Sequence, residues 1–346
     1  METLFGKNKK FYKANLHCHS KKSDGKATVE RIKEVYKAAG YSVVAFTDHD
    51  AIYSNSHLND EDFLAITSFE LAIKEDPRLS TLVAHRMKCV HLNLFALDEK
   101  NTVTPCYDPI YNKYKNEWSG EVRYDGIYTR DMSADGINEI IEIAHEKGFL
   151  VCLNHPGWSL LDATDYLEYE GLDMVEIYNH SCASMGDPGD EGVLDIMARN
   201  GITPFCTAAD DNHSGVLLGS YGSDSLGGWV MIDAPSLEYG AIMNALKNGD
   251  FYASSGPEIY SISRDDDGIY VKCSDAKAVY VSTDSRVRAR HLAEEDDYIN
   301  EAFLDPVGFF DKFRIIVEDE KGRRAYSQFY NVNRRRQKAT KNDERQ

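Results

Sequence analysis

The sequence predicts an α/β fold, in which a closed or nearly closed barrel of parallel strands is followed by a small β-rich unit. Apolar, β-branched runs of strand length occur seven times before residue 210, and several of them alternate with helical patterns. Strands that alternate with helices form parallel sheets, and seven such strands suggest a barrel. After residue 257 the helical patterns stop and short strand patterns with turns follow.

The seven runs predict strands over 12–17, 42–47, 63–69, 89–97, 149–154, 174–178 and 202–208. Helices are expected over 28–39, 138–147, 192–200 and 236–247, where apolar residues recur at helical spacing. A glycine follows each of the first three predicted helices, at Gly40, Gly148 and Gly201, and marks its end.

The chain divides into three predicted parts: a main domain over 1–257, a β-rich unit over 258–333 and a polar tail over 334–346. Residues 99–131 interrupt the main domain and carry five tyrosines and one tryptophan. Such a segment is too long for an ordinary connection. It is either a lid that contacts substrate or an aromatic flap that packs on the side of the barrel.

Composition limits the classes of partner and compartment. The formal charge of -18 (39 basic minus 57 acidic residues) argues against a partner such as long nucleic acid or an anionic membrane. The seven cysteines are scattered, without a C-x-x-C pair, which favours reduced thiols. Without an apolar N-terminal segment or a run of about 18 apolar residues, the predicted location is the cytoplasm.

Side chains of the types that bind metals stand at or near the ends of these runs. Two histidines occupy positions i and i+2 at the end of the first run, so in an extended strand they point to one face. Further imidazole and carboxylate groups end, follow or lie within the later runs. The candidate ligands are His17, His19, Asp24, His49, Glu70, His91, His155, Asp211 and His213.

In a barrel of parallel strands these ends meet at one rim, where such folds carry their chemistry. We therefore expect the nine side chains to lie together. Mixed imidazole and carboxylate donors suit Zn, Mn or Fe better than Mg or Ca, and this set is large enough for two to three divalent ions. Neighbouring divalent ions polarise a phosphoryl group and activate water, so the predicted chemistry is hydrolysis of a phosphate ester.

The order of these motifs resembles that of a known family. H-C-H-S, F-T-D-H-D, S-F-E, H-L, N-H-P and D-D-N-H follow one another between residues 12 and 215. The polymerase and histidinol phosphatase (PHP) superfamily of metal-dependent phosphoesterases has similar motifs. Residues 227–257 and the β-rich tail are similar to stand-alone PHP phosphoesterases with a C-terminal extension.

The resemblance implies a distorted (βα)7 barrel with a trinuclear site. It implies one ion on His17, His19, Glu70 and Asp211, a second on Glu70, His91 and His155 with Glu70 bridging, and a third on Asp24, His49 and His213. Some members have a histidine where this chain has Asp24, so the third ion could be weaker or of another kind. A metal-bound hydroxide is the expected nucleophile, and no general acid is assigned.

Several neighbouring residues keep two interpretations. Asp210 competes with Asp211 for the role of metal ligand, although the spacing to His213 favours Asp211. Asp48 is expected to orient a ligating histidine. Glu176 is either a substrate contact or part of the polar barrel interior. Asn179 and His180 are substrate contacts or surface residues. Weak candidates for a phosphate grip are Lys22, Lys26 and Arg130, and His57, His85, His145 and His291 are expected to be ordinary surface or core residues.

The function predicted from the sequence is hydrolysis of a phosphomonoester of a small molecule, such as a nucleotide or an amino-alcohol phosphate. Two alternatives stay open. The first is a phosphodiesterase or nuclease that acts on short oligonucleotides. The second is a non-catalytic domain braced by metals, with the β-rich unit as its docking module. The oligomeric state is not predicted.

Overall fold

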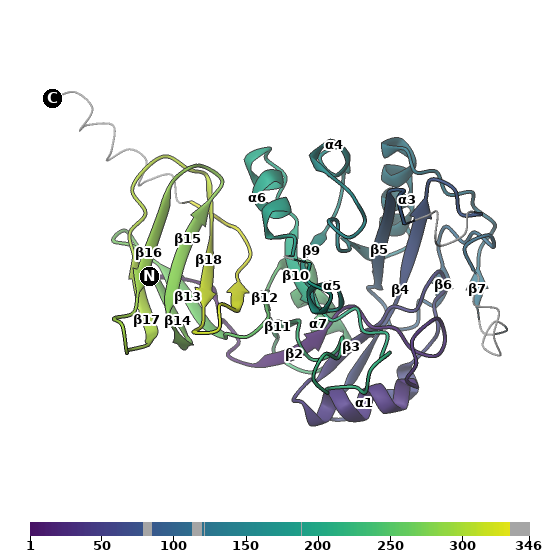
Figure 1. Cartoon of the computed structure of the whole chain (residues 1–346), viewed down its shortest axis with the longest axis horizontal. Helices are drawn as coiled ribbons and strands as arrows, with labels where there is room; N and C mark the ends of the chain where they lie inside the picture. Colours follow the sequence, from purple (N-terminus) through teal and green to yellow (C-terminus); the bar gives the residue numbers. More distant parts are fainter. Residues whose placement is uncertain (79–84, 113–119, 121, 188, 333–346) are drawn as a thin grey trace.

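One large sheet joins the two halves of the chain in the computed structural model, which describes residues 1–78, 85–112, 120, 122–187 and 189–332 (Figure 1). The sheet has 14 strands, and a smaller sheet of four strands packs beside its C-terminal part. No helix within the described ranges has both the length and the apolar character that crossing a membrane requires. The predicted α/β class is confirmed.

All seven predicted strands are present, side by side, in the order β10-β9-β8-β5-β4-β3-β2. Their bounds are β2 (Phe11–Asn15), β3 (Val43–Phe46), β4 (Leu64–Lys74), β5 (Cys89–Ala96), β8 (Phe149–Leu153), β9 (Met174–Asn179) and β10 (Phe205–Ala209). Most of their residues are buried, as the continuous apolar runs indicated.

The prediction of a wholly parallel sheet is wrong for β5, which pairs antiparallel with both β4 and β8. No helix is seen between β4 and β5 in the part of their connection that the structure describes, and an antiparallel neighbour needs no helical crossover. In this register Ala72 of β4 faces His91. The start of β5, and not its end, therefore lies beside the ends of the parallel strands.

The two outer strands of this group approach each other beyond their ends. The Asp211 N–H donates to the carbonyl of His17 at 2.9 Å, and the His19 N–H donates to the carbonyl of Asn212 at 3.1 Å. Cys18 and Asn212 form an isolated parallel bridge. These bonds bring the first and last strand ends together, while a closed (βα)7 barrel remains a prediction.

The four predicted helices are found with shifted ends: α1 (Val29–Ala38), α3 (Ala134–Glu146), α6 (Glu191–Arg199) and α7 (Tyr239–Asn248). α3 begins four residues before its predicted start because the Ser133 hydroxyl caps it, accepting from the Gly136 N–H. Among the described residues, three short helical elements were not predicted: η1 (Ser56–Leu58), α4 (Ala163–Tyr166) and α5 (His180–Ser184).

The large sheet continues from β2 into the C-terminal half through β11 (Trp229–Asp233), β12 (Phe251–Ser254), β19 (Arg324–Tyr326), β18 (Lys312–Glu318), β15 (Ala278–Thr283) and β16 (Arg288–Leu292), with β20 (Tyr330–Asn331) also paired to β18. The small sheet is β1 (Glu2–Phe5), β13 (Ile259–Arg264), β14 (Ile269–Ala276) and β17 (Ile299–Leu304). Residues 258–332 are thus β-rich in the structure, and residues 2–5 join them unexpectedly. The domain boundary at 257 stays a prediction.

The insertion at 99–131 is attached to the sheet where the structure describes it. Its strands β6 (Val103–Thr104) and β7 (Arg123–Tyr124) form a parallel pair. The Thr104 hydroxyl accepts from the Ile52 N–H, and the Tyr111 hydroxyl accepts from the Lys74 N–H. This packing agrees with the flap alternative. Residues 113–119 and 121 of the insertion, and the predicted tail 334–346, lie outside the described residues.

Candidate metal centre

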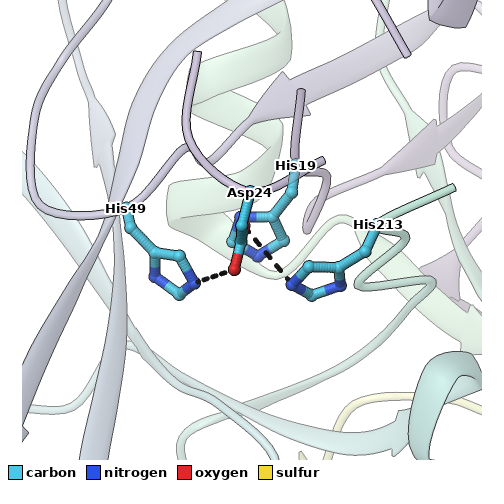
Figure 2. A group of neighbouring side chains, drawn as sticks. All are labelled: His19, Asp24, His49 and His213. Carbon is cyan, nitrogen blue, oxygen red and sulfur yellow. Dashed lines mark ion pairs between the residues drawn. The ribbon is translucent and has the colours of Figure 1, made fainter. Parts of the chain in front are cut away.

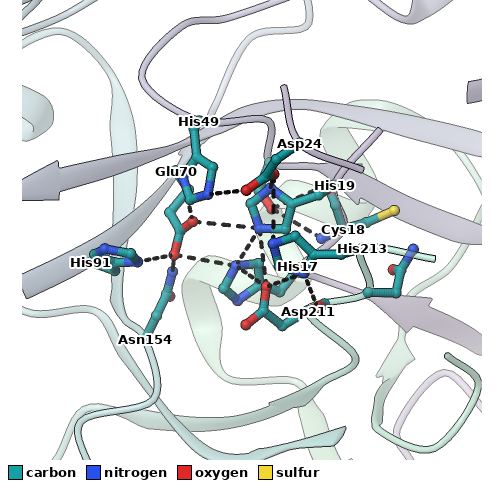
Figure 3. Close-up of polar contacts among 12 residues, drawn as sticks. His17, Cys18, His19, Asp24, His49, Glu70, His91, Asn154, Asp211 and His213 are labelled. Atoms are coloured by element: carbon teal, nitrogen blue, oxygen red, sulfur yellow. Dashed lines mark hydrogen bonds and ion pairs between the residues drawn. The ribbon is translucent and has the colours of Figure 1, made fainter. Parts of the chain in front are cut away.

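All nine predicted ligands lie together at one end of the strand group, and all of them except His155 are labelled in Figure 3. Most follow directly on strands that end there, and His91 comes from the start of β5. The backbone bonds between His17 and Asp211 described above place the first and last contributions side by side. His155 has a φ of 27° and Asp211 a φ of 53°, in the left-handed region that is costly for residues with a side chain and is concentrated at functional sites.

Glu70 is the centre of the cluster. Its Oε1 lies 3.0 Å from His91 Nδ1 and 3.3 Å from His17 Nε2. Its Oε2 lies 2.9 Å from His49 Nδ1 and 3.4 Å from His19 Nε2. Since the two oxygens face different imidazoles, this carboxylate has the geometry of a bridging ligand.

The first group of donors surrounds one point between β2 and β10. His17 Nε2 and His19 Nε2 are 3.2 Å apart. Asp211 Oδ1 lies 3.1 Å from the former and 3.0 Å from the latter. The sets close enough to share one ion are His17, His19 and Glu70, and separately His17, His155 and Asp211, so Asp211 is grouped with His155 and not with Glu70.

The second group is made of Glu70, His91 and His155, whose donor atoms also lie within reach of one ion. His155 Nε2 is 3.5 Å from Glu70 Oε1, while its Nδ1 contacts the Ser159 hydroxyl at 3.1 Å. A hydrogen bond on one ring nitrogen fixes the imidazole so that the other is directed at the cluster.

The third group gathers around Asp24 (Figure 2). Its carboxylate lies 3.4 Å from His49 Nε2 and 3.6 Å from His213 Nε2. His19 joins this group as a fourth member, with Nδ1 3.7 Å from Asp24 Oδ1. The family resemblance implied only three donors here, so His19 lies between the first and third groups.

Without cations the cluster holds protons. Burial lowers the pKa of His91, but Glu70 outweighs it and the pKa rises to about 9. Burial likewise opposes the effect of Asp24 and Asp211 on His213, whose pKa rises to about 9. Burial would raise the pKa of Glu70, yet the surrounding imidazoles hold it well below its usual range. The carboxylates therefore attract positive charge, which a metal ion can supply in place of protons.

Buried polar atoms without partners test whether metals fit. Within the described residues, His91 Nε2 and His19 Nδ1 are buried and make no hydrogen bond. Burying such atoms unsatisfied is costly, whereas they are ordinary donors to a cation. The donor set of six imidazoles and three carboxylates thus fits divalent metal ions.

Three further residues position the ligands, and sequence reasoning missed or misjudged them. Glu176 Oε1 contacts His17 Nδ1 at 3.2 Å, and Asn154 donates to Glu70 Oε1 at 2.9 Å. Asp224 accepts from the His213 N–H at 2.7 Å. Glu176 lies inside a predicted strand and Asn154 at the end of another, and a polar residue in an apolar run is a signal that could have found them, whereas nothing local marks Asp224.

Asp48 and Asp210 are not in the cluster. Asp48 Oδ1 accepts from the Ser20 N–H at 2.8 Å and from the Ser23 hydroxyl at 2.7 Å, so it holds the loop that carries Asp24 and does not orient a histidine. Asp210 accepts from the Tyr36 hydroxyl at 2.7 Å and from the backbone N–H groups of residues 226–228. Asp210 thus supports a loop, whereas Asp211 lies in the cluster.

The weaker candidates have other roles. Arg130 is buried in an ion pair with Asp50 and donates to the Ala72 carbonyl at 2.7 Å, while Lys22 donates to Asn55 Oδ1 at 3.1 Å. Neither they nor Lys26 line the cavity beside the cluster. Asn179 donates to Glu176 and Asp211, and the His180 Nδ1 contacts the Tyr178 hydroxyl. Of the four histidines expected to be ordinary, His85 lines the cavity, His57 and His145 pair with carboxylates and His291 is exposed.

A cavity of about 650 Å³ opens onto the cluster. Asp24, His49, Glu70, His91, His155, Asp211 and His213 form its floor. Lys74 and Lys88 line it together with Glu75 and Asp76, and Lys88 is paired with Asp162 and Asp165. Trp158, Leu160 and Met185 provide a partly exposed apolar wall. The Trp158 ring lies edge-on to His155 with 4.9 Å between centroids. Such a site can hold a small molecule that has an anionic end and an apolar body.

Comparisons with known proteins concern the fold. No family model matches the chain, and no curated protein matches it by sequence. A two-domain protein from Bacteroides vulgatus ATCC 8482, described as containing a predicted PHP-like metal-dependent phosphoesterase, is a similar solved structure. It is 12% identical, the match covers 96% of this chain and 97% of that one, and the TM-score is 0.42.

Two further solved structures match part of the chain. One is a candidate metal-dependent phosphoesterase from Bifidobacterium adolescentis ATCC 15703, with 16% identity, coverage of 58% of this chain and 87% of that one, and a TM-score of 0.36. The other is an amidohydrolase from Chromobacterium violaceum with bound sulfate and no metal, with 13% identity, the same coverage of 58% and 87%, and a TM-score of 0.37. Solved structures similar to this chain thus include PHP-like phosphoesterases, but at these values the likeness assigns no activity to it.

Proposed function

We propose that this protein is a metal-dependent phosphoesterase that hydrolyses a phosphomonoester of a small molecule in the cytoplasm. The observation that carries the proposal is the cluster itself: donor groups for more than one cation share Glu70 and form the floor of a cavity. Divalent ions bound there would polarise a phosphoryl group and lower the pKa of a bound water.

Two to three ions would be held as the motifs imply. The first would use His17, His19, Glu70 and Asp211, the second Glu70, His91 and His155, and the third Asp24, His49 and His213. Nitrogen and carboxylate donors of this kind suit Zn, Mn or Fe. Glu176 and Ser159 would keep two of the imidazoles in the required orientation.

Charge supports a phosphomonoester as substrate. With neutral imidazoles the three carboxylates contribute -3, so two or three divalent ions leave a positive site that suits a phosphate dianion. The net charge of -18 disfavours a long polyanion. The apolar wall at Trp158, Leu160 and Met185 would receive the leaving group.

The test is a phosphatase assay on the purified protein loaded with Mn, Zn or Fe. p-Nitrophenyl phosphate and a panel of phosphorylated metabolites should release phosphate, and Asp211→Ala should abolish this activity. Asp296→Ala removes an exposed carboxylate outside the cavity and is the matched control. No phosphate release from any of these substrates would refute the proposal.

The same assay separates the alternatives. Faster hydrolysis of bis(p-nitrophenyl) phosphate than of the monoester would indicate a phosphodiesterase. Stoichiometric metal without hydrolysis of either ester would indicate a metal-braced domain that is not an enzyme.

A further inference from the structure

A second cavity, of about 760 Å³, lies between α6 and the C-terminal part of the large sheet. Figure 1 shows α6 on the side of the main domain that faces β15 and β18. The lining comes from α6, β15, β16, β18 and β19, and it shares no residue with the cavity at the metal cluster. Its volume is within the range of small-molecule sites.

The charge of this cavity is opposite to that of the chain. Four arginines line it, Arg288, Arg290, Arg314 and Arg324, against the two carboxylates Glu191 and Asp195. The lining residues therefore have a net charge of +2 (4 - 2), in a protein of net charge -18. Such a local reversal of charge attracts small anions.

Arg314 is the clearest sign of a missing partner. Its side chain is 1% exposed, and its only ion pair with a residue that the structure describes joins Nη2 to Asp195 Oδ1 at 2.8 Å. Its Nε and Nη1 are buried and find no hydrogen-bond acceptor in the described part of the chain. The rings of Tyr326 and Phe329 lie 5.5 Å from its Cζ, which supports the positive charge but cannot accept in-plane N–H bonds.

The other arginines differ in how far they are neutralised. Arg324 pairs with Glu191 at 3.0 Å and with Glu318 at 2.7 Å. Within the described ranges, the Arg288 side chain donates only to oxygens of residues 283, 285 and 287, none of them a carboxylate. Arg290 is exposed and has neither an ion pair nor a hydrogen bond among the described residues. Two guanidinium groups thus lack a counter-charge, and a third has unsatisfied donors.

We propose that this cavity is a binding site for a small organic anion. A phosphate or carboxylate would accept hydrogen bonds from Arg314 and Arg290, since guanidinium groups recognise both anions through paired N–H donors. The body of the ligand would lie against Tyr280, Val281 and Ile316, which line the same cavity. The site is separate from the metal cluster and independent of the proposed hydrolase activity.

Isothermal titration calorimetry on the full-length, metal-depleted protein tests the proposal. The probes are inorganic phosphate, AMP and citrate, with adenosine as an uncharged control, each in 50 mM and 150 mM NaCl. We expect at least one anion to bind one to one, and more weakly at the higher salt concentration. Preference for AMP and phosphate over citrate would identify a phosphate ligand, and the reverse a carboxylate.

Variants locate the binding. Arg290→Ala and Arg314→Leu should each weaken the interaction at least tenfold, whereas Arg286→Ala, an exposed arginine outside the cavity, should leave it unchanged. Should Arg314→Leu unfold, Arg290→Ala decides alone, because Arg290 is exposed. The proposal is refuted if no anion binds, if adenosine binds as tightly as AMP, if Arg290→Ala binds like the wild type, or if Arg286→Ala causes the same loss.

Discussion

Glu176→Gln tests whether Glu176, a carboxylate outside the predicted ligand set, positions the ligands. Glu176 is buried and contacts three groups. Its Oε1 faces His17 Nδ1 at 3.2 Å, and its Oε2 accepts from the His155 N–H at 3.0 Å and from the Asn179 amide at 2.9 Å. Glutamine has the same shape but only one acceptor oxygen.

The amide oxygen should stay with the two N–H donors, so the amide nitrogen would face His17. The Nδ1 of His17 would then have to accept a hydrogen bond, which places the proton on Nε2. A protonated Nε2 cannot bind a metal, and this atom lies 3.1 Å from Asp211 Oδ1 in the first donor group. Orienting partners of ligating histidines contribute about 10- to 100-fold in metal affinity or activity, or about 1.4 to 2.8 kcal/mol. We expect the upper end of that range.

Metal affinity would be measured by competition with a chromophoric chelator, alongside phosphatase activity at limiting and excess metal. Excess metal should restore part of the activity of Glu176→Gln, since the defect lies in binding. Glu142→Gln, on the exposed face of α3, controls for the loss of one charge. Metal affinity within twofold of the wild-type value would refute the reasoning.

Three further predictions follow from the cluster and its supports. Removal of metal by a chelator should lower the melting temperature. Free metal at a hundredfold excess over its dissociation constant stabilises the native state by about 2.7 kcal/mol. An unchanged melting temperature after metal removal would argue against binding. Asp210→Ala should reduce the unfolding free energy in urea by about 3 kcal/mol or more, because it leaves buried donors unpaired, while metal content persists. Metal affinity should rise with pH up to about 9, because below that pH His91 and His213 hold protons that the metal must displace. Calorimetry in buffers of different ionisation enthalpy should detect the released protons, and a pH-independent affinity would contradict the assignment.

The ligand cluster was predictable because its signal is local. Each apolar run marks a strand, and a polar side chain at the end of a buried strand has few structural reasons to be there. His155 illustrates this: the apolar run before it and Pro156 after it place it at a strand end, and the structure puts it beside Glu70. His91 lies in the cluster for a reason that the sequence did not show, since β5 runs in the opposite direction and brings its start there.

Asp224 and the arginine cavity were not predictable, because they depend on contacts between distant segments. Arg314 and Asp195 are 119 positions apart, and neither belongs to a motif. The joining of β1 to β13 likewise pairs residues 2–5 with residues 262–264, and the short apolar stretch at Leu4 and Phe5 gives no hint of its partner. Alternation along β15 and β18 predicts which side chains face a core, but not that guanidinium groups gather where α6 passes the sheet. Local sequence patterns thus predict functional side chains at strand ends. They do not predict a cavity formed between an α-helix and a distant sheet, because its lining residues come together only on folding.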